Sequence, residues 1–390
     1  MKFSKRAQAI APFYAMAFGE EAAKLEAEGH HIVKLNIGEP DFGATPDVLK
    51  TLGDLQNGAP LPYTSALGLP ELRAAIANFY KTHHGLNIGP NRIVVTAGAS
   101  AALLLLSAAF VDEGSKVIMG DPSYPCNRQF IRSFGGQVDL VPTQASTRFQ
   151  LNMDLLQKYW QDETRGLMLA TPSNPTGTSV AVDELKAMCE FAKSHGAWRI
   201  IDEIYLNLHH GDANTKPISA LSFDDDAFIV NSFSKYFGMT GWRLGWCVVP
   251  ESCVNVLENL AQNYYICPSS IAQKAALKCF SDDSLALCES RRMTLVKRKE
   301  IVLSGLQKCG LSIPVIPDSA FYVYIDVSQT GLSAMEFCER VLQEAHVALT
   351  PSNDFGECGN QHFVRLSFAS SEEALHLGIE RLGVFMRSIA

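Results

Sequence analysis

Short apolar runs recur over residues 92–249, and many of them are followed by a segment with helical periodicity. Several of these runs are apolar at almost every position, as expected for strands that are covered on both faces of a sheet. Strands that alternate with helices favour a mainly parallel α/β sheet. Seven strands are predicted, at residues 92–96, 116–120, 137–142, 166–171, 198–202, 227–232 and 244–249.

After residue 249 the pattern becomes helical and then mixed. A charged helix is predicted over residues 283–309. The segment after it contains two predicted strands and two predicted helices, at residues 321–325, 362–368, 333–345 and 371–388. Another helix is predicted over residues 8–29, with an apolar stripe and a glycine at its end.

These elements predict two domains of unequal size. Residues 41–282 are expected to form a large α/β domain, with a mainly parallel seven-stranded sheet covered by helices. Residues 283–390 are expected to form a smaller α+β C-terminal domain, joined by an N-terminal arm and helix at residues 1–40. The length of 390 residues agrees with this division, because it exceeds one ordinary hydrophobic core. Parallel sheets bind ligands outside the carboxyl ends of their strands, where most candidate residues fall.

The composition excludes several kinds of partner. Hydrophobic residues make up 47% of the chain and charged residues 19%, which is typical of a compact soluble protein. The net charge is -8 and no basic stripe is visible, so we expect no nucleic acid partner. The longest apolar run, residues 99–111, is too short to span a bilayer, so we expect no membrane association.

The cysteines and the N-terminus indicate a cytoplasmic protein. The ten cysteines show neither a C-x-x-C pair nor a Cys/His spacing for a metal, so we expect free thiols in a reducing compartment and no metal site. The apolar stretch after the basic start is short, and Pro12 and the acidic pair Glu20-Glu21 interrupt it, which makes a poor signal peptide.

One segment suggests a specific chemistry. Ser232, Ser234 and Lys235 follow an apolar predicted strand, and Arg243 lies eight residues further on. An amine at the end of a buried strand can form an imine with an aldehyde, while hydroxyls and a guanidinium can hold a phosphate. Pyridoxal 5'-phosphate (PLP) carries both groups. A lysine in a surface loop is the alternative, and the apolar strand before Lys235 and the glycines after it argue against that alternative.

This segment resembles the lysine-attachment motif of class I and II aminotransferases, in the aspartate aminotransferase superfamily of fold-type I PLP enzymes. The turn over residues 172–177, with the sequence P-S-N-P-T-G, is close to the N-P-T-G motif of that family. The matching motifs follow the family's order from Gly38 to Arg365, so the resemblance covers almost the whole chain. It implies a PLP-dependent aminotransferase that moves an amino group from an amino acid to a 2-oxo acid.

The resemblance also implies a role for each polar residue near the cofactor ring. Lys235 forms an imine with PLP and then moves the proton at the substrate Cα as base and acid. Asp202 keeps the pyridine nitrogen protonated. Asn174 and Tyr205 hydrogen-bond to the ring hydroxyl oxygen, and Tyr124 stacks on the ring. Taken singly, a helix-capping aspartate, a core tyrosine and turn residues explain these positions about equally well.

The phosphate of PLP is expected at the turn before the longest apolar run. A helix that begins there presents free N–H groups and the positive end of its dipole to an anion. Ala99 and Ser100 stand at this point in the chain. The resemblance adds Ser232, Ser234 and Arg243 to the same phosphate site. Small residues at such turns also serve packing or capping alone, so the turn by itself leaves both readings open.

Gly38, Asn174 and Arg365 are expected to hold the substrate carboxylate. Gly38 lets the backbone come close, and an arginine on an apolar strand favours an anion, which it can bind in a bidentate pair. An internal salt bridge is the alternative for Arg365. Tyr63 matches a tyrosine that reaches the phosphate of the neighbouring subunit, so the resemblance implies a homodimer with shared active sites. A tyrosine in a turn is the alternative for Tyr63.

Two other kinds of function remain open from the sequence. Relatives with the same fold carry out other PLP reactions, including C–S β-elimination, aminocyclopropane-carboxylate synthesis and racemisation. Related PLP-binding domains also occur in non-enzymatic transcription regulators, fused to a DNA-binding domain. We expect no such extension here, and the acidic charge disfavours DNA.

The amino donor is less well defined than the reaction. Some relatives that use acidic substrates carry a lysine where this chain has Ser100, and no second arginine for a distal carboxylate is apparent. Several aromatic residues are available to line an apolar pocket, although core packing explains them equally well: Phe13, Tyr14, Tyr124, Tyr264 and Tyr265. We favour a neutral or aromatic amino donor, with 2-oxoglutarate or pyruvate as the acceptor.

Overall fold

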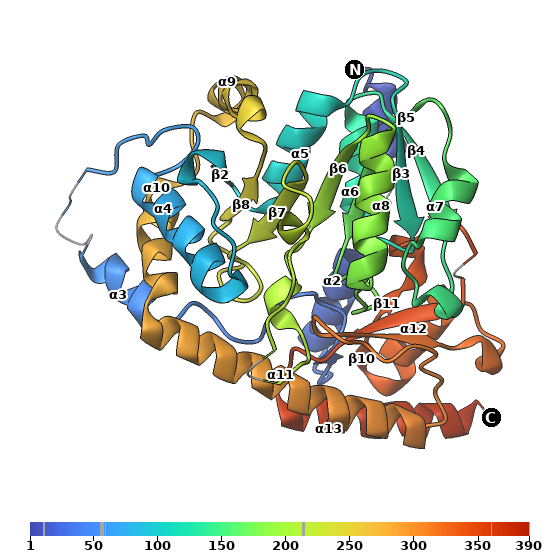
Figure 1. Ribbon diagram of the computed structural model, residues 1–390. Coiled ribbons are helices and arrows are strands. Elements are labelled where there is room, and N and C mark those ends of the chain that lie inside the picture. Colours follow the sequence, from blue (N-terminus) through green and yellow to red (C-terminus); the bar gives the residue numbers. More distant parts are fainter. Residues whose placement is uncertain (11, 55–57, 59, 213–214, 360, 390) are drawn as a thin grey trace.

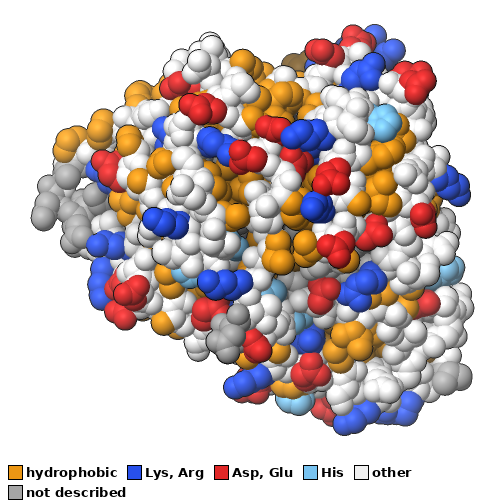
Figure 2. Space-filling model, viewed as in Figure 1, with side chains coloured by type: hydrophobic (Ala, Val, Ile, Leu, Met, Phe, Trp, Pro, Cys, Tyr) orange, Lys and Arg blue, Asp and Glu red, His pale blue; other side chains and the backbone are white. Residues whose placement is uncertain are grey.

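The structure, a computed structural model, describes residues 1–10, 12–54, 58, 60–212, 215–359 and 361–389. A sheet flanked by helices forms its larger part, and a smaller lobe of strands and helices lies beside it (Figure 1). The long helix α11 (Asp282–Lys308) runs along one side of both parts and packs on α13 (Glu372–Ser388). On the face shown in Figure 2, charged side chains of both signs are interspersed among apolar ones. Within the described residues, no helix is long and apolar enough to cross a membrane.

The central sheet has seven strands, which confirms the predicted fold class. Their order in space is β2-β8-β7-β6-β5-β3-β4. The strands from β7 to β4 are parallel, and β8 runs antiparallel to both of its neighbours. Each strand lies within two residues of its predicted position: β2 (Ile93–Thr96), β3 (Lys116–Asp121), β4 (Gln137–Pro142), β5 (Thr164–Ala170), β6 (Trp198–Asp202), β7 (Phe228–Ser232) and β8 (Gly245–Val248).

Alternate side chains of the sheet enter two separate cores, as the period of two along a strand requires. Val94 and Cys247 belong to the core that includes the buried face of α5 (Ala99–Phe110), while Val95 and Trp246 belong to the core on the other face. Every residue of β2, β7 and β8 is buried. Burial on both faces explains why these strands appear in the sequence as nearly uninterrupted apolar runs.

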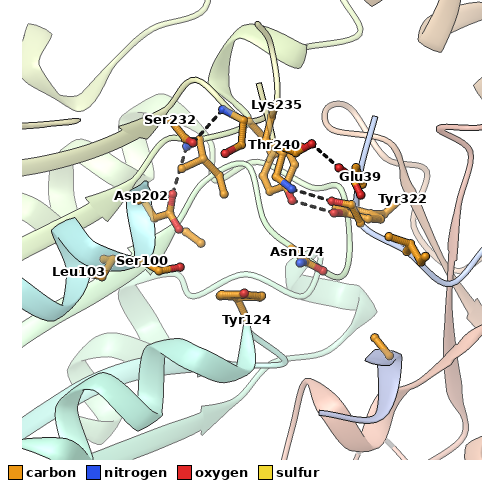
Figure 3. Close-up of a pocket in the computed structure, with 18 of the residues that line it drawn as sticks. Glu39, Ser100, Leu103, Tyr124, Asn174, Asp202, Ser232, Lys235, Thr240 and Tyr322 are labelled. Atoms are coloured by element: carbon orange, nitrogen blue, oxygen red, sulfur yellow. Dashed lines mark hydrogen bonds between the residues drawn. The ribbon is translucent and has the colours of Figure 1, made fainter. Parts of the chain in front are cut away.

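The strand register brings the ends of three strands to one edge of the sheet. Thr96 ends β2 and pairs with Gly245, the first residue of β8, which also pairs with Ser232 at the end of β7. A Cβ on Gly245 would lie 2.7 Å from the backbone nitrogen of Ala99, so glycine is required where α5 begins so close to the sheet. The start of α5 and the turn that carries Lys235 therefore meet at this edge (Figure 3).

The smaller lobe holds a three-stranded antiparallel sheet in the order β11-β12-β9. Its elements are β9 (Tyr322–Asp326), α12 (Ala334–Ala345), β11 (Thr350–Pro351), β12 (Phe363–Ser367) and α13. Near the N-terminus, β1 (Val33–Lys34) pairs in parallel with β10 (Val347–Ala348), which ties the arm to this lobe. The domain limits proposed from the sequence stay a prediction.

The predicted helix over residues 8–29 is wrong at its start. Two helices are present, α1 (Lys5–Ala9) and α2 (Tyr14–Ala27). A proline lies between them, and proline cannot donate a backbone hydrogen bond. The carboxylate of Asp354, in the smaller lobe, accepts from the N–H groups of the first two residues of α2 at 2.6 and 2.7 Å. This cap comes from a distant part of the chain, so the local sequence does not show where α2 begins.

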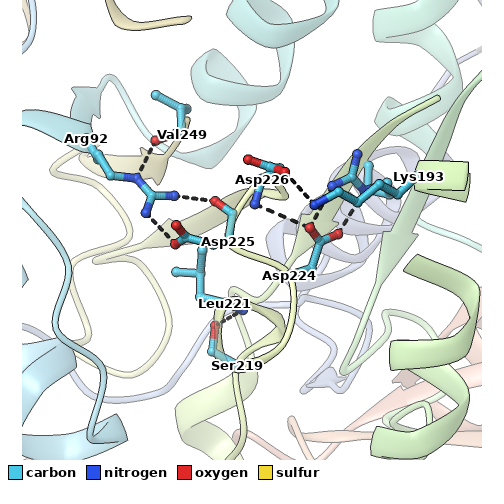
Figure 4. Close-up of polar contacts among 9 residues, drawn as sticks. Arg92, Lys193, Ser219, Leu221, Asp224, Asp225, Asp226 and Val249 are labelled. Atoms are coloured by element: carbon cyan, nitrogen blue, oxygen red, sulfur yellow. Dashed lines mark hydrogen bonds and ion pairs between the residues drawn. The ribbon is translucent and has the colours of Figure 1, made fainter. Parts of the chain in front are cut away.

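Three consecutive aspartates before β7 form polar contacts at the other end of the sheet (Figure 4). Asp224 and Arg199 are 4% and 7% exposed, and hydrogen bonds of 2.6 and 2.8 Å make them a bidentate ion pair. This pair ties β6 to the loop that leads into β7. Asp226 pairs with Lys193 at 2.5 Å, but both of these side chains are more than half exposed.

Asp224→Ala is expected to lower the free energy of unfolding by about 3–5 kcal/mol, because it leaves the buried guanidinium of Arg199 without its counter-charge. The matched control Asp226→Ala breaks an exposed ion pair and should cost no more than about 1 kcal/mol. Equilibrium urea unfolding of the two variants measures the difference. Equal losses would show that burial of the first pair does not matter for stability.

Candidate active site

A cavity of about 380 Å³ lies at the carboxyl edge of the sheet, between the start of α5 and the strands of the smaller lobe (Figure 3). Its lining includes every predicted site residue except Tyr63: Gly38, Ala99, Ser100, Tyr124, Asn174, Asp202, Tyr205, Ser232, Ser234, Lys235, Arg243 and Arg365. Residues more than 300 positions apart in the chain thus meet in one place, as the strand-end argument predicted.

Tyr63 lies outside the lining of this cavity and is 76% exposed. The hydroxyl of Ser270, at the start of α10 (Ser270–Ala276), donates to the carbonyl of Pro62 at 2.7 Å. This contact fixes the backbone next to Tyr63 and leaves its ring at the surface. The predicted contact of Tyr63 with a neighbouring subunit stays a prediction.

Lys235 lies in the turn after β7 and reaches the cavity (Figure 3). Its Nζ donates to the carbonyl of Gly38 at 2.6 Å and lies 5.8 Å from the centre of the Tyr205 ring. Burial, and secondly the nearby charge of Arg365, lowers the pKa of Lys235 to about 8. An amine of this pKa is partly neutral at physiological pH and therefore nucleophilic.

Asp202 ends β6 and is 3% exposed. One carboxylate oxygen, Oδ1, accepts from the backbone N–H of Ile204 at 3.1 Å. Burial raises the pKa of Asp202 to about 7. A buried carboxylate of this kind favours a proton or a cation beside it, and a protonated ring nitrogen is such a partner.

Arg365 reaches the cavity from β12 and is 2% exposed. Its Nη1 donates to Oδ1 of Asn174 at 2.8 Å, and its Nη2 donates to the carbonyl of Asn36 at 2.5 Å. The side-chain oxygen of Asn174 therefore accepts from Arg365, and the amide N–H groups of Asn174 are available to donate to a ligand. Among the described residues no carboxylate pairs with Arg365 and its Nε has no partner, so the internal salt bridge considered above is not found.

The start of α5 and the guanidinium of Arg243 form a cradle of donors. Ala99 and Ser100 are the first residues of the helix, and they follow Gly98, whose φ of 88° favours glycine. A Cβ on Gly98 would lie 2.6 Å from Nη2 of Arg243, so only a glycine lets the guanidinium come this close. Free N–H groups at a helix start together with a guanidinium make a binding site for an anion.

The turn after β7 completes this cradle. The hydroxyl oxygen of Ser232 accepts from the backbone N–H of Ser234 at 2.9 Å. Arg243 has a φ of 50°, which is strained for a residue with a side chain, and its Nη1 donates to the carbonyl of Thr240 at 2.8 Å. Strain of this kind is typical of residues held for binding or catalysis.

The donor set of the cavity fits PLP. The anion cradle matches its phosphate, the buried carboxylate of Asp202 matches its basic ring nitrogen, and the amine of Lys235 matches its aldehyde. Tyr124 offers a ring face at the same cavity, and its edge-to-face contact with Phe13, with ring centres 6.3 Å apart, helps to fix it.

Three polar residues in the lining of the cavity were not predicted from the sequence: Glu39, Thr240 and Tyr322. The hydroxyl of Thr240 donates to Oε1 of Glu39, which joins the N-terminal arm to the turn that follows Lys235 (Figure 3). The hydroxyl of Tyr322 lies 2.7 Å from that of Tyr205. Tyr322 and Tyr324 occupy alternate positions of one predicted strand, and nothing in that alternation tells which tyrosine reaches the cavity.

Comparison with known proteins finds one family over most of the chain. A sequence model of the family described as aminotransferase class I and II matches residues 30–382. The valine–pyruvate aminotransferase of Mycobacterium tuberculosis is 34% identical over 380 residues, which cover 97% of each chain. An aspartate aminotransferase of Geobacillus stearothermophilus is 32% identical over 397 residues, which cover 100% of each chain.

Solved structures agree with this result. An aminotransferase from Mycobacterium tuberculosis superimposes with a TM-score of 0.95 at 34% identity, covering 100% of both chains. The aspartate aminotransferase from Thermus thermophilus with maleate superimposes with a TM-score of 0.92 at 31% identity, covering 99% of both chains. The fold is therefore shared over the whole length of these proteins.

The reactivity of Lys235 is expected to rise as the pH passes through about 8, because below that pKa the amine is protonated and above it neutral. Trace acetylation of the PLP-free protein, followed by peptide mass spectrometry at several pH values, measures this. The exposed Lys24, whose pKa is raised by its hydrogen bond with Glu21, should react only at higher pH. Matching profiles for the two lysines would contradict the lowered pKa.

Proposed function

This chain belongs to the class I and II aminotransferases, and from that membership we propose how its cavity carries out amino transfer from an amino acid to a 2-oxo acid. The family is PLP-dependent, and the relatives that match over the full chain are named aminotransferases. C–S β-elimination and a non-enzymatic regulatory role are therefore not favoured. The observation that carries the assignment of residues is the meeting of Lys235, Asp202 and Arg365 in one cavity.

When bound, PLP supplies an aldehyde that bonds to amines and a ring that takes up the electrons left when the substrate Cα loses a proton. Lys235 would hold the cofactor covalently, and the cradle at the start of α5 would bind its phosphate. Asp202 would pair with the ring nitrogen, and Tyr124 would lie against the ring face. Tyr205 and Asn174 would donate hydrogen bonds to the ring oxygen.

Lys235 is also the residue that would move the proton at the substrate Cα. With a pKa of about 8, its amine can accept and release a proton near physiological pH, as general acid–base catalysis requires. Its hydrogen bond to Gly38 holds the amine beside the segment that we assign to the substrate carboxylate. Binding and proton transfer are thereby brought to the same side of the cavity.

Arg365 would bind the substrate carboxylate, and its surroundings keep the guanidinium in place. Its carbon Cζ lies 4.7 Å from the centre of the Tyr322 ring and 4.8 Å from that of Phe355. The hydrogen bonds to Asn174 and Asn36 fix the guanidinium further. A fixed guanidinium orients a carboxylate as well as binding it, which decides the Cα bond that faces Lys235.

A neutral or aromatic amino donor fits the rest of the lining best, with 2-oxoglutarate or pyruvate as the acceptor. Apolar side chains contribute much of the wall, including Phe13, Met16, Ile37 and Leu103. Among the described lining residues the only cations are Lys235, Arg243 and Arg365, and each already has a role. A distal carboxylate would meet no further cation and would lie in the same cavity as the carboxylate of Glu39. Relatives of similar identity include both a valine–pyruvate and an aspartate aminotransferase, so the choice of donor rests on the lining of the cavity.

The active form that we propose is a cytoplasmic homodimer in which Tyr63 reaches the phosphate site of the partner subunit. Leu61 and Tyr63 are 43% and 76% exposed, beside the start of α10, and Leu49 is 49% exposed. A partner subunit that covers this surface would remove these apolar side chains from water. All ten cysteines are free, which supports a reducing compartment.

Lys235→Ala is expected to lower kcat for amino transfer by a factor of about 10⁴ or more, because it removes both the covalent holder of the cofactor and the proton carrier. The exposed Lys193, which pairs with Asp226 away from the cavity, provides the control variant Lys193→Ala. On addition of an amino donor and a 2-oxo acid, the control should form the new 2-oxo acid product and the Lys235 variant should not. Retained amino transfer without Lys235 would rule out its assigned role.

The ratio of kcat/KM for valine or phenylalanine to that for aspartate is expected to exceed about 10, because the distal carboxylate of aspartate would be buried without a cation. A steady-state assay with each donor and a common 2-oxo acid measures it. A preference for aspartate or glutamate would contradict the proposed donor class and would leave the assignment of amino transfer intact.

A further inference from the structure

Tyr322 touches three parts of the proposed active site at once. It begins β9 and is fully buried. Its hydroxyl lies 2.7 Å from the hydroxyl of Tyr205, and its ring covers the guanidinium of Arg365 at 4.7 Å. A Cβ on Gly38 would lie 2.5 Å from the same hydroxyl, so the arm comes close to Tyr322 because residue 38 is glycine.

We propose that Tyr322 is a positioning residue that aims the hydroxyl proton of Tyr205 at the ring oxygen of the cofactor and holds the guanidinium of Arg365 flat for the substrate carboxylate. This inference rests on the proposed function of the site, since it assumes that Tyr205 serves the cofactor and Arg365 the substrate. It assigns to Tyr322 an action through two other residues, without contact with the atoms that react.

Either hydroxyl can be the donor in this hydrogen bond, and we take Tyr322 as the donor. Burial raises the pKa of both phenols, so each keeps its single proton. If Tyr205 donated to Tyr322, the proton of Tyr205 would not be available to the ring oxygen of the cofactor. If Tyr322 donates, its proton is used and the proton of Tyr205 is free to point into the cavity.

The ring of Tyr322 acts separately from its hydroxyl. The guanidinium carbon of Arg365 lies over the rings of both Tyr322 and Phe355, at 4.7 and 4.8 Å from their centres. Two aromatic neighbours restrict rotation of the guanidinium plane, while Asn174 and Asn36 hold its nitrogen atoms. The hydroxyl and the ring therefore serve different partners, and two substitutions can separate them.

Tyr322→Phe keeps the ring and removes the hydroxyl. In the PLP-loaded variant, the pH midpoint of the change in the visible band of the cofactor should be higher than in the wild type. The reason is that a ring oxygen with a weaker hydrogen-bond donor carries more negative charge and so holds a neighbouring proton more strongly. The shift should have the same sign as that of Tyr205→Phe and be smaller. KM for the amino donor should stay within about 2-fold, since Arg365 keeps its ring contact, while kcat falls by about 3–10-fold.

Tyr322→Leu removes the ring as well. It should show the same spectral shift and, in addition, a KM for the amino donor raised by about 10-fold or more, because Arg365 loses one of the two faces that hold it. A split of this kind, with kcat affected by the hydroxyl and KM by the ring, is not expected from a residue that only fills space.

Tyr324→Phe is the matched control. Tyr324 lies two positions further along β9 and is equally buried, but it packs on Phe149 and Phe363 and does not line the cavity. Its loss of a hydroxyl should leave the pH of the spectral change and both kinetic constants as in the wild type. A shift equal to that of Tyr322→Phe would overturn the proposal.

The outcomes distinguish this proposal from the proposed function. If Tyr205→Phe shifts the band and Tyr322→Phe does not, the role of Tyr322 is wrong and the function stands. If neither Tyr205→Phe nor Lys235→Ala alters the bound cofactor, the assignment of the site itself fails. A crystal structure of the PLP-loaded wild type gives a test without variants, because a distance between the two hydroxyls beyond hydrogen-bond range would overturn the inference.

Discussion

At Gly245 the backbone of β8 runs so close to the start of α5 that an added carbon would lie 2.7 Å from the nitrogen of Ala99 and 2.9 Å from the carbonyl oxygen of Asn231. Gly245 pairs with the last residues of both β2 and β7. The same close approach therefore places the helix start, with its free N–H groups, beside the turn that carries Lys235. A larger residue at this position would move the anion cradle away from the amine, and one cofactor could no longer reach both.

Burial shifts the ionisable groups of the cavity in opposite directions for one reason. Removal from water penalises the charged form, so the pKa of Lys235 falls to about 8 while that of Asp202 rises to about 7. The pKa values of both groups are consequently near physiological pH, where each group can gain or lose a proton. Water-exposed lysines and aspartates have pKa values far from this pH. The nearby charge of Arg365 adds to the lowering of the pKa of Lys235.

The sequence was sufficient where the cause is local or where a motif fixes the order of residues. The strands were predicted because burial on both faces leaves apolar runs in the sequence. Lys235 and Asp202 were assigned to the candidate site because they follow such runs, in an order shared with a known family. Tyr322 was missed because its importance depends on Tyr205 and Arg365, which other elements bring to it. The start of α2 was missed because its cap, Asp354, lies 340 residues away from Tyr14 in the chain.

One part of the cavity wall comes from a different part of the chain than the reactive groups. Phe13 and Met16 belong to the N-terminal arm, whose helix α2 begins where Asp354 caps it, whereas Asp202 ends β6 of the central sheet and Lys235 lies in the turn after β7. Substitutions in the arm or around Asp354 can therefore reshape the space for the donor side chain and leave the sheet unchanged. Related enzymes with this arrangement can therefore come to accept different amino acids while the reaction at the substrate Cα stays the same.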